Sequence, residues 1–222
     1  MTTELSISGI LPATLYPATT SRLSAFCDSA DSFALREEVY ERTAASSSGA
    51  PAPDPDSQRV RVKALRTRSK GERVEWTIQL NQKPEPPRTA PRALQFGVTE
   101  FAVEEGSDPR ALVDSLGFSK KAFVTHRRGQ VWRRGAVSVE LFQLYESDTA
   151  PEPLDPASYA VSVSTRFTAS SSSSSSAPNG RATSNPGTPG AGASQEVRDR
   201  AIAALEDVAR LLKGLVDLAR VD

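Results

Sequence analysis

The sequence is poor in the residues on which most disulfide, zinc and nucleophile chemistry depends. It contains one cysteine, Cys27, and one histidine, His126, among 222 residues. A single cysteine excludes an intrachain disulfide framework and a zinc site built from cysteines. A single histidine excludes a histidine-rich metal site, and a Ser-His-Asp arrangement would have to use His126 as its base. We expect no catalytic residue, no metal and no cofactor.

Long apolar runs are also missing, and the charges cancel. No stretch approaches the ~20 apolar residues that cross a bilayer, and residues Met1–Glu4 lack the positive charge and apolar run of a signal peptide. We therefore expect a soluble intracellular protein without a membrane partner. The sequence has 27 Lys+Arg and 27 Asp+Glu. This balance argues against general coating of nucleic acid and leaves local basic patches open. We expect no direct sequence-specific nucleic-acid binding.

Proline, serine, alanine and glycine are concentrated in two segments, 44–57 and 169–194. Such composition cannot bury enough apolar surface to offset the entropy of ordering, so both are predicted to be disordered. The polyserine run that ends at Ser176 is typical of a flexible tether. The predicted organisation is a body over residues 1–168 with an insertion at 44–57, a tether over 169–194, and a C-terminal helix over 195–222.

Alternation of apolar and polar residues dominates the rest of the chain and predicts half-buried strands. The expected strands cover residues 5–11, 33–41, 60–64, 74–80, 94–103, 122–134, 137–145 and 159–167. The count is eight if 122–134 is one bent strand and nine if Gly129 turns it into a hairpin. The phase changes within 94–103, and a bulge near Thr99 would restore it.

Three helices are expected among these strands. A short one covers about 17–27, and a second follows Ser107-Asp108-Pro109, an N-cap with proline near the first helical position, and stops at Gly117. The third has an apolar face of Ala201, Leu205, Val208, Leu212, Leu215 and Ala219. An isolated helix is marginal in water, so we favour packing on the body over a free face that captures a partner. Many short strands with few helices indicate an α+β protein built on a closed, largely antiparallel β-barrel.

Two basic runs are candidates for binding anions. Arg59, Arg61 and Lys63 share one face of a strand and are followed by Arg66, Arg68 and Lys70; the second run contains Lys120, Lys121, His126, Arg127, Arg128, Arg133 and Arg134. Basic rows inside a barrel could grip polyphosphate, and outside it they could contact nucleic acid. The sequence does not decide between lumen and solvent. The favoured interpretation is a solvated face, balanced by Glu37, Glu38, Glu41, Glu100, Glu104 and Glu105.

A metal-dependent hydrolase would need several glutamates on one strand face. Glu37 and Glu41 share a face, but the opening strand offers Glu4 and then Ser6 and Ser8. We therefore expect no metal site in this chain.

The remaining reactive or aromatic residues are expected to have structural roles and no catalytic or ligand-binding role. His126 has no orienting partner nearby in the sequence and is expected to be an exposed loop residue. Cys27 ends an apolar helix face and is expected to pack as a small core residue. Trp76 and Trp132 are expected in the core.

One order of segments is specific enough to suggest a family. It runs through Leu5–Leu11, Leu112–Phe118, Phe123-Val124, Gly129, Val131–Gly135 and Val137–Tyr145. Read as helix, Gly-Phe, strand, glycine, aromatic, basic pair, glycine and apolar strand, this order resembles subunit 18 of the Mediator complex, in a divergent fungal form. The resemblance covers nearly all of the chain predicted to be ordered and neither predicted disordered segment, and it includes no catalytic signature.

The resemblance implies an eight-stranded barrel similar to those of RNA triphosphatases and related tunnel enzymes. It further implies a nuclear, non-catalytic coactivator subunit of the Mediator head module that acts with RNA polymerase II. The implied partners are Mediator subunit 20, as a heterodimer, the C-terminal helix of Mediator subunit 8, and other head subunits. The alternative is a hydrolase of polyphosphate or RNA 5′-triphosphate. Four or more carboxylates converging near Arg59–Lys63 inside the barrel would favour the hydrolase.

Overall fold

The computed structural model describes residues 2–42, 59–71, 73–168 and 191–221. The predictions of disorder for 44–57 and for residues 169–190 of the tether lie outside the described residues. None of the helices in the described part of the chain is long and apolar enough to span a membrane.

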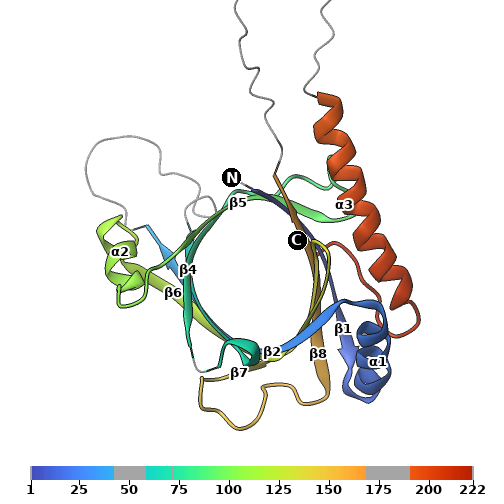
Figure 1. The fold of residues 1–222 in the computed structure, drawn as a ribbon. Coiled ribbons are helices and arrows are strands. Elements are labelled where there is room, and N and C mark those ends of the chain that lie inside the picture. Colours follow the sequence, from blue (N-terminus) through green and yellow to red (C-terminus); the bar gives the residue numbers. More distant parts are fainter. Residues whose placement is uncertain (1, 43–58, 72, 169–190, 222) are drawn as a thin grey trace, which may run out of the picture.

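Eight strands close into one antiparallel barrel, which confirms the predicted fold class (Figure 1). Around the barrel the strands follow the order β1-β5-β4-β3-β2-β6-β7-β8. Their bounds are β1 Thr2–Pro12, β2 Ser29–Glu41, β3 Arg59–Thr67, β4 Glu75–Asn81, β5 Leu94–Ala102, β6 Lys120–Arg134, β7 Val137–Tyr145 and β8 Ser158–Phe167.

Two details left open by the sequence concern β6 and β5. β6 is one continuous strand, so the count is eight; a Cβ at Gly129 would lie 2.0 Å from the Leu141 carbonyl oxygen, which shows how closely β6 approaches β7 there. The prediction of a bulge near Thr99 is wrong, because β5 pairs with β1 and with β4 in unbroken register. Phe101 therefore stays on the outer face, 54% exposed.

The main hydrophobic core lies outside the barrel, between its wall and the helices. Helices α1 (Tyr16–Phe26) and α3 (Ala191–Leu211) cover one side of the ring, and α2 (Pro109–Ser115) covers the opposite side (Figure 1). The larger cluster joins the outward residues of β1, β6, β7 and β8 to α1 and α3, and a smaller one joins β2, β3 and β4 to α2. Because side chains alternate across a strand, the intervening residues face the lumen, where charged side chains lie beside a small apolar cluster that includes Phe33 and Val131.

The short helices end where the sequence predicted. The Asp108 side chain caps α2 by accepting a hydrogen bond from the Arg110 backbone N–H at 2.9 Å, and Pro109 occupies the first turn. Gly117 follows α2 with φ 88°, a left-handed conformation that favours glycine. α1 begins after a 3₁₀ turn, Ala13–Leu15.

The C-terminal helix packs against the barrel, but its bounds differ from the prediction. α3 begins at Ala191, inside the segment expected to be tether, and ends at Leu211, well before the predicted end at residue 222. Gly214 adopts φ 84° and turns the chain, so Val216 is buried in place of Leu215. The chain then crosses β1, where Ser8 and Ala219 exchange backbone hydrogen bonds of 2.8 and 3.0 Å.

Candidate functional site

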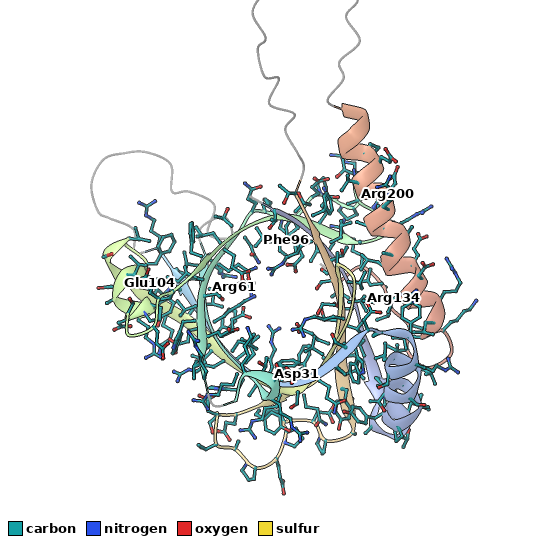
Figure 2. All side chains as sticks on the ribbon, in the orientation of Figure 1. Asp31, Arg61, Phe96, Glu104, Arg134 and Arg200 are labelled. Carbon is teal, nitrogen blue, oxygen red and sulfur yellow. The ribbon has the colours of Figure 1, made fainter. Side chains whose placement is uncertain are left out.

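The row Arg59, Arg61 and Lys63 on β3 lines the barrel lumen. These residues line a cavity of about 310 Å³, and Figure 2 shows Arg61 projecting toward the interior of the ring. The interpretation as a solvated face is therefore wrong for this row. The reason is parity: the intervening Val60 and Val62 are buried under α2, which leaves the lumen for the basic side chains.

Glu37 on β2 neutralises two cations in this cavity. Its buried carboxylate pairs with Arg61 and, at 3.2 Å, with Arg127 of β6. Burial opposes the charged form of this carboxyl, but the charges of Lys63, Arg127 and Arg61 outweigh it and lower the pKa of Glu37. The Glu37 carboxylate is therefore charged and paired with Arg61 and Arg127.

A second lumen cavity, of about 240 Å³, lies beyond Lys63, which lines both cavities. Arg166 of β8 pairs with Glu4 at 2.6 Å and with Glu100 at 2.7 Å. Glu140 of β7 lines the same space, and burial raises the pKa of its carboxyl despite the nearby positive charge of Arg127. This end of the lumen is thus also close to charge balance.

Lys63 lies between these groups. Its ammonium donates a hydrogen bond to the Gln79 side-chain oxygen at 2.5 Å. Burial lowers the pKa of Lys63, although the negative charge of Glu37 partly offsets the effect. Lys63 is thus held by an amide oxygen and by the nearby negative charge of Glu37, and no other basic residue of β3 lines both cavities.

The lumen carboxylates do not converge on one point. Glu4, Glu37, Glu75, Glu100 and Glu140 line the two cavities and come from five different strands, β1, β2, β4, β5 and β7. Within residues 2–42, 59–71, 73–168 and 191–221, no group of three or more His, Cys, Asp or Glu side chains could hold a metal ion. The count of five meets the number of carboxylates set for the hydrolase, but their geometry does not, and four of the five pair with an arginine or a lysine.

The second basic run divides between the two faces of β6. Arg127 and Arg133 line the lumen, whereas Arg128 lies over the Tyr145 ring at 4.2 Å and Arg134 over Phe26 at 3.8 Å. The latter two arginines therefore pack on aromatic rings instead of forming a free basic patch.

His126 is not the exposed loop residue that was expected. It lies within β6, its side chain is 14% exposed, and its Nδ1 is 2.6 Å from the Asp148 carboxylate. The partner is 22 residues away in the sequence, which is why local reasoning missed it. This contact joins the β7–β8 connection to the barrel wall.

Cys27 and the two tryptophans pack as apolar residues. Cys27 is half-buried beside the larger core, and burial raises the pKa of its thiol. Trp132 is 1% exposed and donates from Nε1 to the Ser24 hydroxyl at 3.2 Å. Trp76 packs against the smaller cluster, with the Arg110 guanidinium 5.6 Å from its ring centre. The core assignment is confirmed for Trp132, and Trp76 forms the edge of the α2 cluster.

A charged contact holds α2 on the barrel, and sequence reasoning did not find it. The buried Glu38 carboxylate accepts two hydrogen bonds from Arg110, at 2.6 and 3.0 Å, and one from the Tyr40 hydroxyl at 2.5 Å. It also forms an ion pair with Arg36 at 2.6 Å. Burial raises the pKa of this group, but the bonds from Arg110 and Tyr40 dominate and hold the pKa of Glu38 at about 2. Glu37 and Glu38 are neighbours on β2, so their side chains point to opposite faces of the strand. This alternation is the one sequence signal that distinguishes the roles of the two glutamates.

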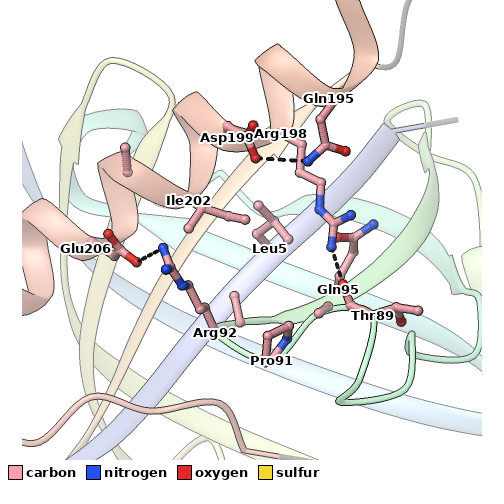
Figure 3. Close-up of a pocket in the computed structure, with 13 residues that line it drawn as sticks. Leu5, Thr89, Pro91, Arg92, Gln95, Gln195, Arg198, Asp199, Ile202 and Glu206 are labelled. Carbon is pink, nitrogen blue, oxygen red and sulfur yellow. Dashed lines mark hydrogen bonds and ion pairs between the residues drawn. The ribbon is translucent and has the colours of Figure 1, made fainter. Parts of the chain in front are cut away.

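A groove of about 400 Å³ separates residues 195–206 of α3 from the segment before β5 (Figure 3). Leu5 and Ala93 form its buried floor, and Ile202 and Ala203 form the helix side. Two contacts bridge it: Arg92 pairs with Glu206 at 2.9 Å, and Arg198 donates to the Thr89 carbonyl at 2.7 Å. The groove offers an apolar floor with polar rims, which is typical of binding sites.

Comparison with known proteins supports the fold. No protein-family model and no curated protein matches the sequence. A chain of the Schizosaccharomyces pombe Mediator head module matches with a TM-score of 0.68 and 18% identity, over 99% of this chain and 98% of that chain. The PH1819 protein of Pyrococcus horikoshii matches with a TM-score of 0.55 and 12% identity, over 99% and 94%. At these identities the similarities show the fold alone.

A plant protein also resembles the barrel more distantly. It is a putative adenylyl cyclase of Hippeastrum described as having a dominant triphosphatase activity, with a TM-score of 0.41 and 13% identity, over 93% of this chain and 88% of that chain. A similarity at this level is no argument about the activity of the present chain.

Proposed function

We propose that this protein is a non-catalytic subunit of the Mediator head module. The observation that carries the proposal is the match in fold along the whole chain, TM-score 0.68 over 99% of this chain, to a chain of the Schizosaccharomyces pombe head module. The order of segments from Leu112 to Tyr145 supports the same assignment independently of the coordinates. In this role the protein is a nuclear scaffold that helps to regulate transcription by RNA polymerase II.

We further propose the partners that the resemblance implies. The protein forms a heterodimer with Mediator subunit 20, and the C-terminal helix of subunit 8 attaches it to the rest of the head. The outer face of the barrel supports such contacts: Phe101 on β5, and Leu112 and Leu116 at α2, are each at least half exposed. These exposed apolar side chains are the positions at which we place the partner contacts.

Reconstitution tests these partners. The chain is co-expressed with subunit 20 and the subunit 8 helix from the same organism, and the products are separated by size exclusion. One stoichiometric complex is expected. Replacing Phe101 and Leu112 together by Ser should weaken it, whereas replacing Leu154, an exposed residue elsewhere with 65% exposure, should not. Separate elution of all three chains contradicts the proposed pairing.

The alternative, a hydrolase of polyphosphate or RNA 5′-triphosphate, is favoured by one observation: Arg59, Arg61 and Lys63 lie inside the barrel with glutamates nearby. Against it, Glu37 pairs with two arginines, and no three His, Cys, Asp or Glu side chains of the described residues could together hold a metal ion. Purified protein with Mg²⁺ or Mn²⁺ should release no phosphate from ATP or triphosphate-ended RNA. Phosphate release that disappears when Glu37 is replaced by Gln supports the hydrolase instead.

A further inference from the structure

The groove between α3 and the segment before β5 contains two buried polar atoms without partners. Gln95 is 8% exposed; its side-chain nitrogen donates to Glu85 at 2.6 Å, but its side-chain oxygen has no hydrogen-bond partner among the described residues. Arg198 donates from its terminal nitrogen to Thr89, but its Nε is also unpartnered in the described chain. Both residues line the groove (Figure 3).

The hydrogen-bonding character of each unpartnered atom defines the group that would satisfy it. The Gln95 oxygen is an acceptor and requires a donor, and the Arg198 Nε–H is a donor and requires an acceptor. Leaving a buried polar group unsatisfied is unfavourable. An occupant that offers one N–H and one C=O therefore complements the groove, and an amide is the common group that has both.

The charge and the shape of the groove further restrict the chemical class of molecule that could bind in it. The charged groups at the rim balance: Arg92 and Arg198 against Asp199 and Glu206. The occupant of the groove is therefore neutral. The floor of Leu5 and Ala93 and the side of Ile202 are apolar, and the volume of about 400 Å³ lies in the ~300–1,000 Å³ range of ligand sites. An apolar side chain next to a free amide fits these features.

We propose that this groove binds an extended peptide segment of a partner protein, with a neutral apolar side chain on the Leu5–Ala93 floor and a backbone amide between Gln95 and Arg198. A helical segment does not fit as well, because amides inside a helix are already bonded to the residue four positions away. The proposal concerns the chemistry of one groove and does not require membership in Mediator. Its failure and that of the proposed function are therefore separately observable.

The test uses a minimal peptide as the probe. N-acetyl-leucine N-methylamide is titrated into the ¹⁵N-labelled full chain, and the backbone amide shifts are followed by NMR. We expect saturable shifts confined to Leu5, Ala93, Gln95 and residues 195–206 of α3. The methyl ester analogue keeps the acetyl amide with its N–H and C=O and should still bind. N-acetyl-N-methyl-leucine dimethylamide keeps the carbonyl groups and the apolar side chain but lacks both N–H donors, and it should bind about fivefold to tenfold more weakly, the effect of losing one uncharged hydrogen bond. The glycine analogue lacks the apolar side chain and should also bind more weakly.

Two variants locate the binding. Ala203→Trp fills the groove from the exposed side of α3 without altering a buried residue and should abolish the saturable shifts. Arg200→Trp places the same ring elsewhere on the exposed surface of the helix and should leave them unchanged. Equal affinity for the N-methylamide and the fully N-methylated analogue, shifts scattered over the surface, or no saturable shift overturns the proposal. The last result is expected if water alone satisfies Gln95 and Arg198.

Discussion

Leu212→Ala should destabilise the whole protein and not only a terminal appendage. Leu212 is 0% exposed and lies in the large cluster that joins α1 and α3 to the barrel wall. Truncating a fully buried leucine to alanine costs about 2–5 kcal/mol, because apolar transfer energy is lost and a cavity remains. That loss is a large share of a typical domain stability of about 5–15 kcal/mol.

Urea unfolding followed by tryptophan fluorescence measures the effect, since Trp132 belongs to the same cluster. With a denaturant slope of about 1–3 kcal/mol per M, the midpoint should fall by roughly 1 M or more. Leu116→Ala is the matched control: the residue is 55% exposed, so the change should stay near 0.5 kcal/mol. If Leu212→Ala leaves the midpoint unchanged while partner binding is lost, α3 is an interaction element and not part of the domain.

Three further predictions follow from other parts of the structure. The pKa of Glu38 in the folded protein, about 2, lies below its ordinary value of 4.5. The charged Glu38 therefore stabilises the folded protein above pH 4.5, and this contribution is lost as the pH falls toward 2. Glu38→Gln should make the urea midpoint less dependent on pH in this window than it is in the wild type. Gly129→Ala places a methyl group against the Leu141 carbonyl oxygen and should cost about 1–3 kcal/mol or more, measured by thermal unfolding; an unchanged midpoint contradicts the close approach of β6 and β7. Shortening 44–57 and 169–190 should leave the midpoint nearly unchanged, because closing a loop of half the length changes the free energy by only about 0.6 kcal/mol; a drop of many degrees shows that one segment packs.

The strands were predictable because their signal is local. Alternation located all eight, and it fixed β7 at Val137–Tyr145 to the residue. The helix caps were equally local, as Asp108 before Pro109 shows. The helix end was misplaced because the apolar spacing continues past Gly214, whose left-handed conformation ends the regular geometry. Weighing that glycine above the apolar spacing would have corrected the boundary.

The site was less predictable because it depends on pairs from distant strands. The alternation shows that Arg61 and Lys63 share a face, but only the packing of α2 over Val60 and Val62 shows that this face is the lumen. The pairing of Arg166 with Glu4 spans 162 positions. Parity within one strand cannot reveal such a partner, so the sequence indicated a basic row but not its neutralisation.

The central claim is membership in the Mediator head, and affinity purification tests it most directly. The chain is tagged at its N-terminus in the organism that encodes it and purified from nuclear extract, and the bound proteins are quantified by mass spectrometry. The account predicts Mediator head subunits in stoichiometric amounts, with subunit 20 and subunit 8 among them. A tagged chain that complements loss of the untagged one but is recovered without any Mediator subunit contradicts the account.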